Sequence, residues 1–183
     1  MRYNVVFVGS VGAGKTSIIR RFINKSAATT STIAVDFIPI EIDTIQMSIW
    51  DTCGQERFAS ITSSYFSRGH VFVLVHDIQD DSPVKLQKWY KEIEDKTPQR
   101  HESVVVVVSN KTDVHPFAST IITSWIKEHG FDHIYTSAIS GEGIENLFSK
   151  IKDAVVVHQA DWLSPSLPAL PAQPTVKSPG CSC

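Results

Sequence analysis

The sequence predicts an α/β fold with a mixed, mostly parallel sheet of six strands. Short apolar runs rich in valine and isoleucine recur along the chain, and continuous runs of this kind indicate strands buried on both faces. Segments with a helical pattern separate them. Such an alternation is typical of α/β proteins, in which crossover helices connect parallel strands. The strands are expected at residues 5–8, 35–43, 44–51, 71–75, 104–108 and 134–136, and the helices at 16–24, 83–96, 118–129 and 143–158.

Residues 35–51 depart from the parallel pattern, because two strand-like runs follow each other across a tight reversal at residues 43–44. In the second run Ile45, Met47 and Ile49 alternate with other residues, which is the pattern of a half-exposed strand. Pro39 in the first run cannot donate a ladder hydrogen bond, so its strand is expected at an edge of the sheet. The hairpin therefore adds one antiparallel edge strand.

The clearest helix start lies at Ser82 and Pro83. Serine is a favoured N-cap, and proline suits the first helical position because its missing N–H has no helical partner there. Residues 25–34, after the first helix, read instead as a polar loop rich in serine and threonine.

The composition excludes several classes of function. At 183 residues and 42% hydrophobic, the chain has room for one cored domain and a short appendage. A formal net charge of −2 gives no electrostatic case for binding nucleic acid. No stretch approaches the ~18 apolar residues of a membrane-spanning helix, and we see no signal peptide. Three cysteines, two of them in the last three positions, suit a reducing compartment. We therefore expect a soluble, cytosolic protein.

The composition changes at about Gln159. The segment that follows has almost no charge, and its prolines favour an extended, polyproline-like linker. We expect a folded domain at residues 1–158 and a flexible tail at residues 159–183, which ends in Cys181 and Cys183. The prolines of the tail are Pro165, Pro168, Pro171, Pro174 and Pro179.

A phosphate-binding motif joins the first strand to the first helix. The segment matches G-x-x-x-x-G-K-[ST], and its place between a strand and a helix makes it a prediction rather than a glycine-rich turn. Backbone N–H groups would surround phosphate oxygens, the lysine would reach the outer phosphates, and the threonine hydroxyl would bind Mg²⁺. The motif alone leaves ATPases, kinases and GTPases open. Its residues are Gly9, Ser10, Val11, Gly12, Ala13, Gly14, Lys15 and Thr16.

A base-binding motif follows the strand at residues 104–108. Its residues are Asn110, Lys111, Thr112 and Asp113. A carboxylate can accept two N–H bonds from guanine but meets the wrong polarity on adenine. The tetrapeptide alone is weak evidence, since a capped strand-to-helix turn looks similar, but a preceding phosphate motif strengthens it. Ser137 and Ala138, after the last strand, would offer a backbone N–H to the base oxygen.

Taken together, these motifs resemble the Ras superfamily of small GTPases in content and order. That resemblance rests on residues 9–16, 51–56, 110–113 and 137–138. Other segments are similar to the Rab family within it, namely residues 31–37, 49–52, 57–58 and 61–65 and the terminal Cys-x-Cys. The resemblance covers residues 3–158 and the last three. It implies a three-layer P-loop GTPase domain with helices on both faces of the sheet.

The resemblance also implies a role for each matching residue. Thr32 would complete the Mg²⁺ shell with Thr16, and Asp51 would hold the ion through water. Gly54 would sense the γ-phosphate, and Gln55 would be the catalytic residue that orients the attacking water. The residues implied to bind nucleotide, besides these and the phosphate motif, are Ser17, Asn110, Lys111, Asp113, Ser137 and Ala138.

The same resemblance implies a GTP/GDP switch that recruits effectors in vesicle trafficking. It also implies that the protein hydrolyses GTP, and that this hydrolysis is slow without an activating protein. Effectors, exchange factors and activating proteins would contact the switch regions, with Phe37, Trp50 and Tyr65 as apolar contacts unless they pack in the core. Cys181 and Cys183 resemble a doubly prenylated terminus. This implies a monomer that cycles between cytosol and the cytoplasmic face of an intracellular membrane, with a prenylation escort and a GDP dissociation inhibitor as partners.

Several residues depart from the family pattern. Val11 stands beside the γ-phosphate position, where a bulky side chain obstructs the catalytic glutamine, and Ile139 replaces a lysine that supports the base loop. Cys53 replaces alanine, which we interpret as packing. Between Phe22, expected in the core, and Phe37 no aromatic residue is available to stack on the base, so Lys25 would cover it poorly.

Two alternatives stay open at this point. The first is a module that holds guanine nucleotide but scarcely hydrolyses it, which the departures at Val11 and Ile139 suggest. The second is an ATP-using P-loop enzyme such as a small kinase, against which the motif at residues 110–113 argues.

Overall fold

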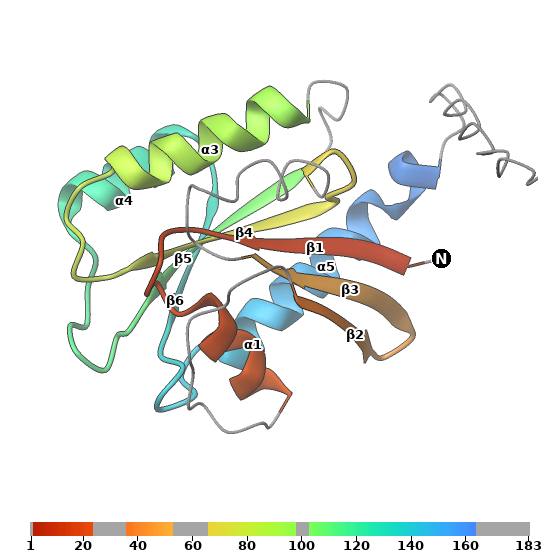
Figure 1. The fold of residues 1–183 in the computed structure, drawn as a ribbon, viewed down its shortest axis with the longest axis horizontal. Coiled ribbons are helices and arrows are strands. Elements are labelled where there is room, and N and C mark those ends of the chain that lie inside the picture. Colours follow the sequence, from red (N-terminus) through yellow and green to blue (C-terminus); the bar gives the residue numbers. More distant parts are fainter. Residues whose placement is uncertain (1, 24–35, 53–65, 98–102, 164–183) are drawn as a thin grey trace, which may run out of the picture.

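The computed structural model describes residues 2–23, 36–52, 66–97 and 103–163, and within them one six-stranded sheet. The strand order is β2-β3-β1-β4-β5-β6 (Figure 1). β2 pairs antiparallel with β3, and the other neighbours are parallel, which confirms the predicted mixed sheet. The strands are β1 (Arg2–Val8), β2 (Asp36–Ile42), β3 (Ile45–Asp51), β4 (Val71–Asp77), β5 (Val104–Asn110) and β6 (Asp132–Thr136).

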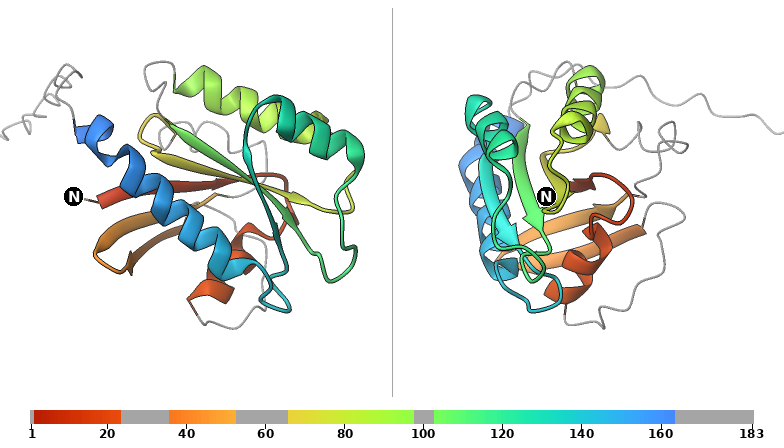
Figure 2. Two further views of the ribbon diagram at one scale, coloured as in Figure 1. Left: turned by 180° about the vertical axis from the view of Figure 1, so that it is seen from behind. Right: turned by 90° about the vertical axis from the view of Figure 1, so that its left-hand side faces the viewer.

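Helices cover both faces of this sheet. Side chains of α1 and α5 pack with one face, and side chains of α3 and α4 pack with the other. Figure 2 shows α5 lying across the sheet when the molecule is seen from behind. The helices in the described residues are α1 (Lys15–Phe22), α3 (Val84–Lys96), α4 (Thr120–Glu128) and α5 (Ile144–Leu163). The three-layer α/β fold predicted from the sequence is therefore confirmed.

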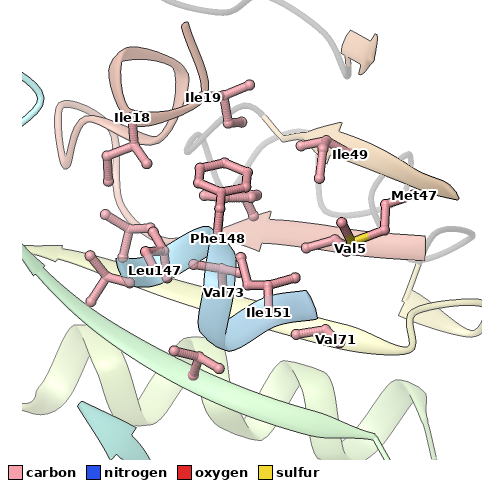
Figure 3. Close-up of a cluster of buried hydrophobic side chains, with 14 of the residues drawn as sticks. Val5, Ile18, Ile19, Met47, Ile49, Val71, Val73, Leu147, Phe148 and Ile151 are labelled. Carbon is pink, nitrogen blue, oxygen red and sulfur yellow. The ribbon is translucent and has the colours of Figure 1, made fainter. Parts of the chain in front are cut away.

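Alternate residues of the central strands supply the two cores. Val5 and Phe7 of β1 belong to the cluster beneath α1 and α5, while Val6 and Val8 belong to the cluster beneath α3 and α4. Figure 3 shows the first cluster around Phe148. Burial of one large apolar side chain contributes about 1.5–3 kcal/mol, so these two clusters hold the strand ends in place beneath the site.

The hairpin of β2 and β3 has the predicted reversal and the predicted edge strand. Asp43, at the reversal, has a left-handed backbone with φ 54°. β2, which contains Pro39, is an edge strand. The expected alternation in β3 is only partly right, because Ser48 is 3% exposed and Ile45 is half-buried. Burial in β3 is continuous over Met47, Ser48 and Ile49, so the strand is covered on both faces at its centre.

Helix bounds differ from the predictions in two informative places. α3 begins at Val84 with Pro83 as the cap residue, although the Ser82 hydroxyl still accepts a hydrogen bond from the Val84 N–H at 3.4 Å. α5 continues to Leu163, beyond the expected end at residue 158. Trp162 explains this extension, because its ring lies 5.8 Å from Tyr3 and 4.9 Å from His70. Tertiary contacts with the start of β1 therefore extend the helix.

Within the described residues, none of the helices combines the length and the apolar character needed to cross a membrane.

Candidate guanine-nucleotide site

The predicted motifs converge at one end of the sheet. Residues 9–14 follow β1, residues 110–113 include the end of β5, and residues 137–138 follow β6. The three strands are parallel, so their carboxyl ends share one edge, which is where open α/β sheets bind ligands. This edge lies at the opposite end of β1 from Tyr3 and the contact with Trp162.

The phosphate loop, residues 9–16, encloses its lysine. The Lys15 ammonium donates to the carbonyl oxygens of Gly9 at 2.8 Å and Ser10 at 3.1 Å, and the residue is only 5% exposed. Gly14 precedes α1 with φ 95° and provides its N-cap. The ammonium and the helix N-terminus thus place positive charge together at the loop, which suits the anionic oxygens of a phosphate.

Thr16 and Asp51 form a fitting pair of Mg²⁺ ligands. The Thr16 hydroxyl donates to Asp51 Oδ2 at 2.5 Å, although 35 residues separate them. Asp51 is 1% exposed at the end of β3, and a carboxylate so deeply buried is stabilised by a cation beside it. Both groups offer the oxygen donors that Mg²⁺ prefers. The Thr52 hydroxyl bonds to the Phe7 carbonyl at 2.7 Å and fixes the strand end that carries Asp51.

Asn110 joins the phosphate loop to the base motif. Its side-chain N–H donates to the Ala13 carbonyl at 2.8 Å, and its side-chain oxygen accepts from the Thr136 hydroxyl at 3.1 Å. Asn110 is 1% exposed and Thr136 is fully buried, so both bonds are shielded from water. A Cβ on Gly14 would lie 2.1 Å from the Asn110 amide nitrogen, so this junction requires glycine. The sequence places Thr136 next to Ser137 and Ala138 in the base loop, but its hydroxyl bond to Asn110 was not predicted, because that bond depends on the β5–β6 pairing.

Asp113 is oriented by the loop after β6. The Ser137 hydroxyl donates to Asp113 Oδ1 at 2.5 Å and accepts from the Ser140 N–H at 3.1 Å. Ser137 is fully buried and Ala138 is 5% exposed. The carboxylate is therefore held through one oxygen, which is the geometry needed for a fixed acceptor facing a base.

A model of the Ras family matches residues 4–157 of the chain, a span that contains every element of this site. This protein belongs to the Ras family. Ras-family proteins are small GTPase switches that bind guanine nucleotide and Mg²⁺ and in general hydrolyse GTP. The arrangement of Lys15, Thr16, Asp51 and Asp113 has the chemistry that this family requires.

The structure also places the residues that depart from the Ras-family pattern. Val11 is 53% exposed at the phosphate loop and Ile139 is 72% exposed, so neither fills the core. Phe22 stacks on Phe148 with ring centroids 3.7 Å apart, so it packs against the core as predicted, although it is only half-buried. The predictions for Lys25, Thr32, Cys53, Gly54, Gln55, Tyr65, Cys181 and Cys183 fall outside the described residues.

Two residues near the site escaped the sequence analysis. Asp77, at the end of β4, forms an ion pair with Lys111 at 2.5 Å. His76, just before it, is 6% exposed, and burial lowers its pKa below the ordinary value. Both line a cavity of about 330 Å³ beside Ser10 and Val11. The only available signal was their place at the end of the strand next to β5.

Proposed function

We propose that this Ras-family protein is a Rab-like GTPase that, in its GTP-bound state, recruits effectors to an intracellular membrane in vesicle trafficking. The observation that carries the proposal is the convergence of a phosphate loop, a hydroxyl–carboxylate pair and an oriented carboxylate on one end of the sheet. The Rab-like part is supported by the sequence segments around this site and by the terminal Cys-x-Cys.

The proposed mechanism combines residues that the structure describes with Thr32, Gly54 and Gln55, which lie outside the described residues. Lys15 and the backbone N–H groups of the phosphate loop bind the phosphates, and Asp113 holds the guanine edge. Thr16 and Asp51, with Thr32 by the family resemblance, would hold Mg²⁺, which would neutralise charge on the phosphate oxygens when bound. Gln55 orients the attacking water. Hydrolysis then removes the γ-phosphate that Thr32 and Gly54 sense, so the effector surface changes with the nucleotide.

An aromatic pair beside the site supports an effector surface. The Phe37 ring lies 5.0 Å from the Trp50 ring, and Phe37 is 47% exposed on the edge strand β2. The Trp50 indole N–H donates to Asn4 Oδ1 at 3.1 Å, so this ring is half-buried and fixed. An exposed aromatic on a fixed aromatic support is the kind of anchor that protein partners bind.

The membrane part of the proposal rests on the tail. α5 ends at the start of β1, whereas the phosphate loop follows the end of β1 (Figure 1). A lipid-carrying tail that leaves from there would keep the nucleotide site away from the bilayer. Two lipid chains on Cys181 and Cys183 are needed for stable attachment, because one chain gives only marginal binding, and Lys177 is the only basic residue of the tail.

Cell fractionation of the variant with both Cys181→Ser and Cys183→Ser tests the membrane proposal. The variant should move to the soluble fraction while its GTP affinity stays that of the parent. The Ser182→Ala variant, which keeps both thiols, is the matched control and should stay on membranes. Membrane recovery that survives the double change would place the anchor elsewhere. Effector recruitment is tested separately, by comparing what the GTP-loaded and GDP-loaded parent proteins retain.

A second candidate function is a module that holds guanine nucleotide with little hydrolysis. The exposed Val11 at the phosphate loop and the exposed Ile139 after the base loop favour it. A single-turnover phosphate-release assay, with and without a cell extract as a source of activating protein, separates the two. If the cell extract accelerates phosphate release, the result supports the switch. If phosphate release stays negligible with and without the extract, the result supports the holding module.

A further inference from the structure

Lys111, in the base motif, is held by a residue that belongs to neither nucleotide motif. Its ammonium donates to Asp77 Oδ2 at 2.5 Å, and Asp77 pairs in register with Asn110 across β4 and β5. Asp77 Oδ1 accepts from the Gln79 N–H at 3.1 Å. Because both carboxylate oxygens are engaged, Asp77 presents a single orientation to the lysine.

The backbone of Asp77 is fixed as well. Its carbonyl oxygen accepts from His76 Nδ1 at 3.0 Å and from the Asp80 N–H at 2.9 Å. His76 must therefore carry its proton on Nδ1, so its Nε2 accepts from the Ser109 hydroxyl at 2.6 Å. The Ser109 oxygen in turn accepts from His133 Nε2 at 2.7 Å. This row of side chains links the ends of β4 and β5 to the start of β6.

Burial agrees with this arrangement. It lowers the pKa of His76, and burial with the neighbouring His76 lowers the pKa of His133 to about 4. Both rings are therefore neutral near pH 7, which is the state that the hydrogen bonds require. Asp77 is consequently a rigid anchor and not a surface carboxylate that can follow the lysine.

The Lys111 backbone is also fixed in a conformation that side chains seldom adopt. Its φ of 76° lies in the left-handed region, which is unfavourable for a residue with a Cβ. Among the described residues other than glycine, only Asp43 shares it, and that residue forms the hairpin reversal. Strain of this kind gathers at functional sites. With both ends fixed, the four-carbon stem of Lys111 spans from the end of β5 to the end of β4.

We propose that Asp77 is a positioning residue for nucleotide retention, which holds the Lys111 stem as an apolar wall of the guanine site. The inference rests on the proposed guanine site at Asp113. In the sequence Lys111 stands between Asn110, which is tied to the phosphate loop, and the base-binding residue Asp113, which is tied to Ser137. Residues 23–36 contain no aromatic side chain that could cover the base instead. A lysine released from Asp77 would leave the base exposed to water on that side.

Release of a fluorescent GDP analogue from the parent and from Asp77→Asn tests the proposal. Asparagine keeps the size and the acceptor for Gln79 but loses the charge that holds the ammonium. We expect release about two- to fivefold faster, the range of a partly exposed ion pair, with an unchanged association rate. Asp80→Asn is the matched control, because it removes the Asp80–Lys85 pair at 2.7 Å on the wall of the same cavity. Its release rate should equal that of the parent.

Two further readouts separate positioning from a general structural effect. Raising the ionic strength should speed release from the parent more than release from Asp77→Asn, because salt weakens the phosphate contacts in both proteins but screens the Asp77–Lys111 pair only in the parent. In a Lys111→Ala background, Asp77→Asn should cause no further increase in the release rate. In the otherwise unchanged protein, Asp77→Glu keeps the charge, so its release rate should lie closer to that of the parent than the rate of Asp77→Asn does.

The inference is overturned if Asp77→Asn releases the GDP analogue at the parent's rate, or if Asp77→Asn accelerates release as much in the Lys111→Ala background as in the parent. Either result leaves the guanine site intact. A parent that binds no GDP overturns the proposed function itself.

Discussion

Replacing Gly14 with alanine should separate the phosphate loop from the base-binding strand. The new Cβ would lie 2.1 Å from the Asn110 amide nitrogen, well inside ordinary contact. Asn110 is 1% exposed and has no free space to retreat into without losing its bonds to Ala13 and Thr136. The residue that holds the two halves of the site together would therefore be displaced.

The cost follows from these contacts. A buried polar group that loses its partner costs about 1–3 kcal/mol, and the displacement breaks two such bonds. Alanine at φ 95° adds roughly 1–2 kcal/mol of backbone strain. We expect a loss of about 3–8 kcal/mol in the free energy of unfolding, which is enough to unfold a large part of a marginally stable domain.

Gly12→Ala is the matched control, because its φ of 78° carries the same backbone strain but its Cβ meets nothing within 4 Å. It should cost only about 1–2 kcal/mol. Urea unfolding of the parent and both variants without nucleotide gives the comparison. Equal losses for Gly14→Ala and Gly12→Ala would refute the reasoning, since the Asn110 contact would then contribute nothing.

Three further predictions concern pH, hydrolysis and nucleotide release. Since the pKa of His133 is lowered from 6.5 to about 4, the unfolded chain takes up the proton first as pH falls. Stability should therefore be complete above pH 6.5 and decline towards pH 4 by roughly 2–3 kcal/mol, after allowance for partial exposure of the ring. Urea unfolding across that range checks this, and His133→Gln should flatten the profile. Gln55→Leu should leave GTP binding intact and slow single-turnover hydrolysis, and equal turnover in both proteins would make Gln55 a bystander. Lys25→Phe should slow release of a fluorescent GDP analogue by roughly tenfold to a hundredfold, because an aromatic ring stacks on the base better than a lysine stem. An unchanged rate would show that the base needs no such cover.

Local patterns were sufficient to predict the framework of the fold. The apolar runs gave the six strands, and Pro39 placed its strand at the sheet edge, because strand burial and a missing N–H are properties of single segments. The phosphate and base motifs were predicted for the same reason, since each follows directly on a strand end. The structure brings Lys15, Asn110 and Asp113 to one edge of the sheet, as that reasoning requires.

What the sequence left out depends on neighbours distant in the chain. Asp77 and Lys111 are 34 residues apart, and their pairing follows from the adjacency of β4 and β5. Trp162 extends α5 through its contact with Tyr3, which lies at the other end of the folded domain in sequence. Ser48 is buried on the face of β3 that the alternating pattern predicted to be exposed. None of these relations is visible in a local pattern.

Nucleotide selectivity of Asp113→Asn tests the central claim of a guanine-specific switch most directly. Ser137 fixes Asp113 through Oδ1, so the carboxylate is a defined acceptor for the guanine edge. The parent should bind GTP and reject ATP in a competition titration. The variant should lose GTP affinity by roughly tenfold to a hundredfold, as one bidentate pair is worth about 1–3 kcal/mol, and should gain affinity for xanthosine triphosphate. Unchanged GTP affinity in the variant, or equal binding of ATP and GTP by the parent, would contradict the account.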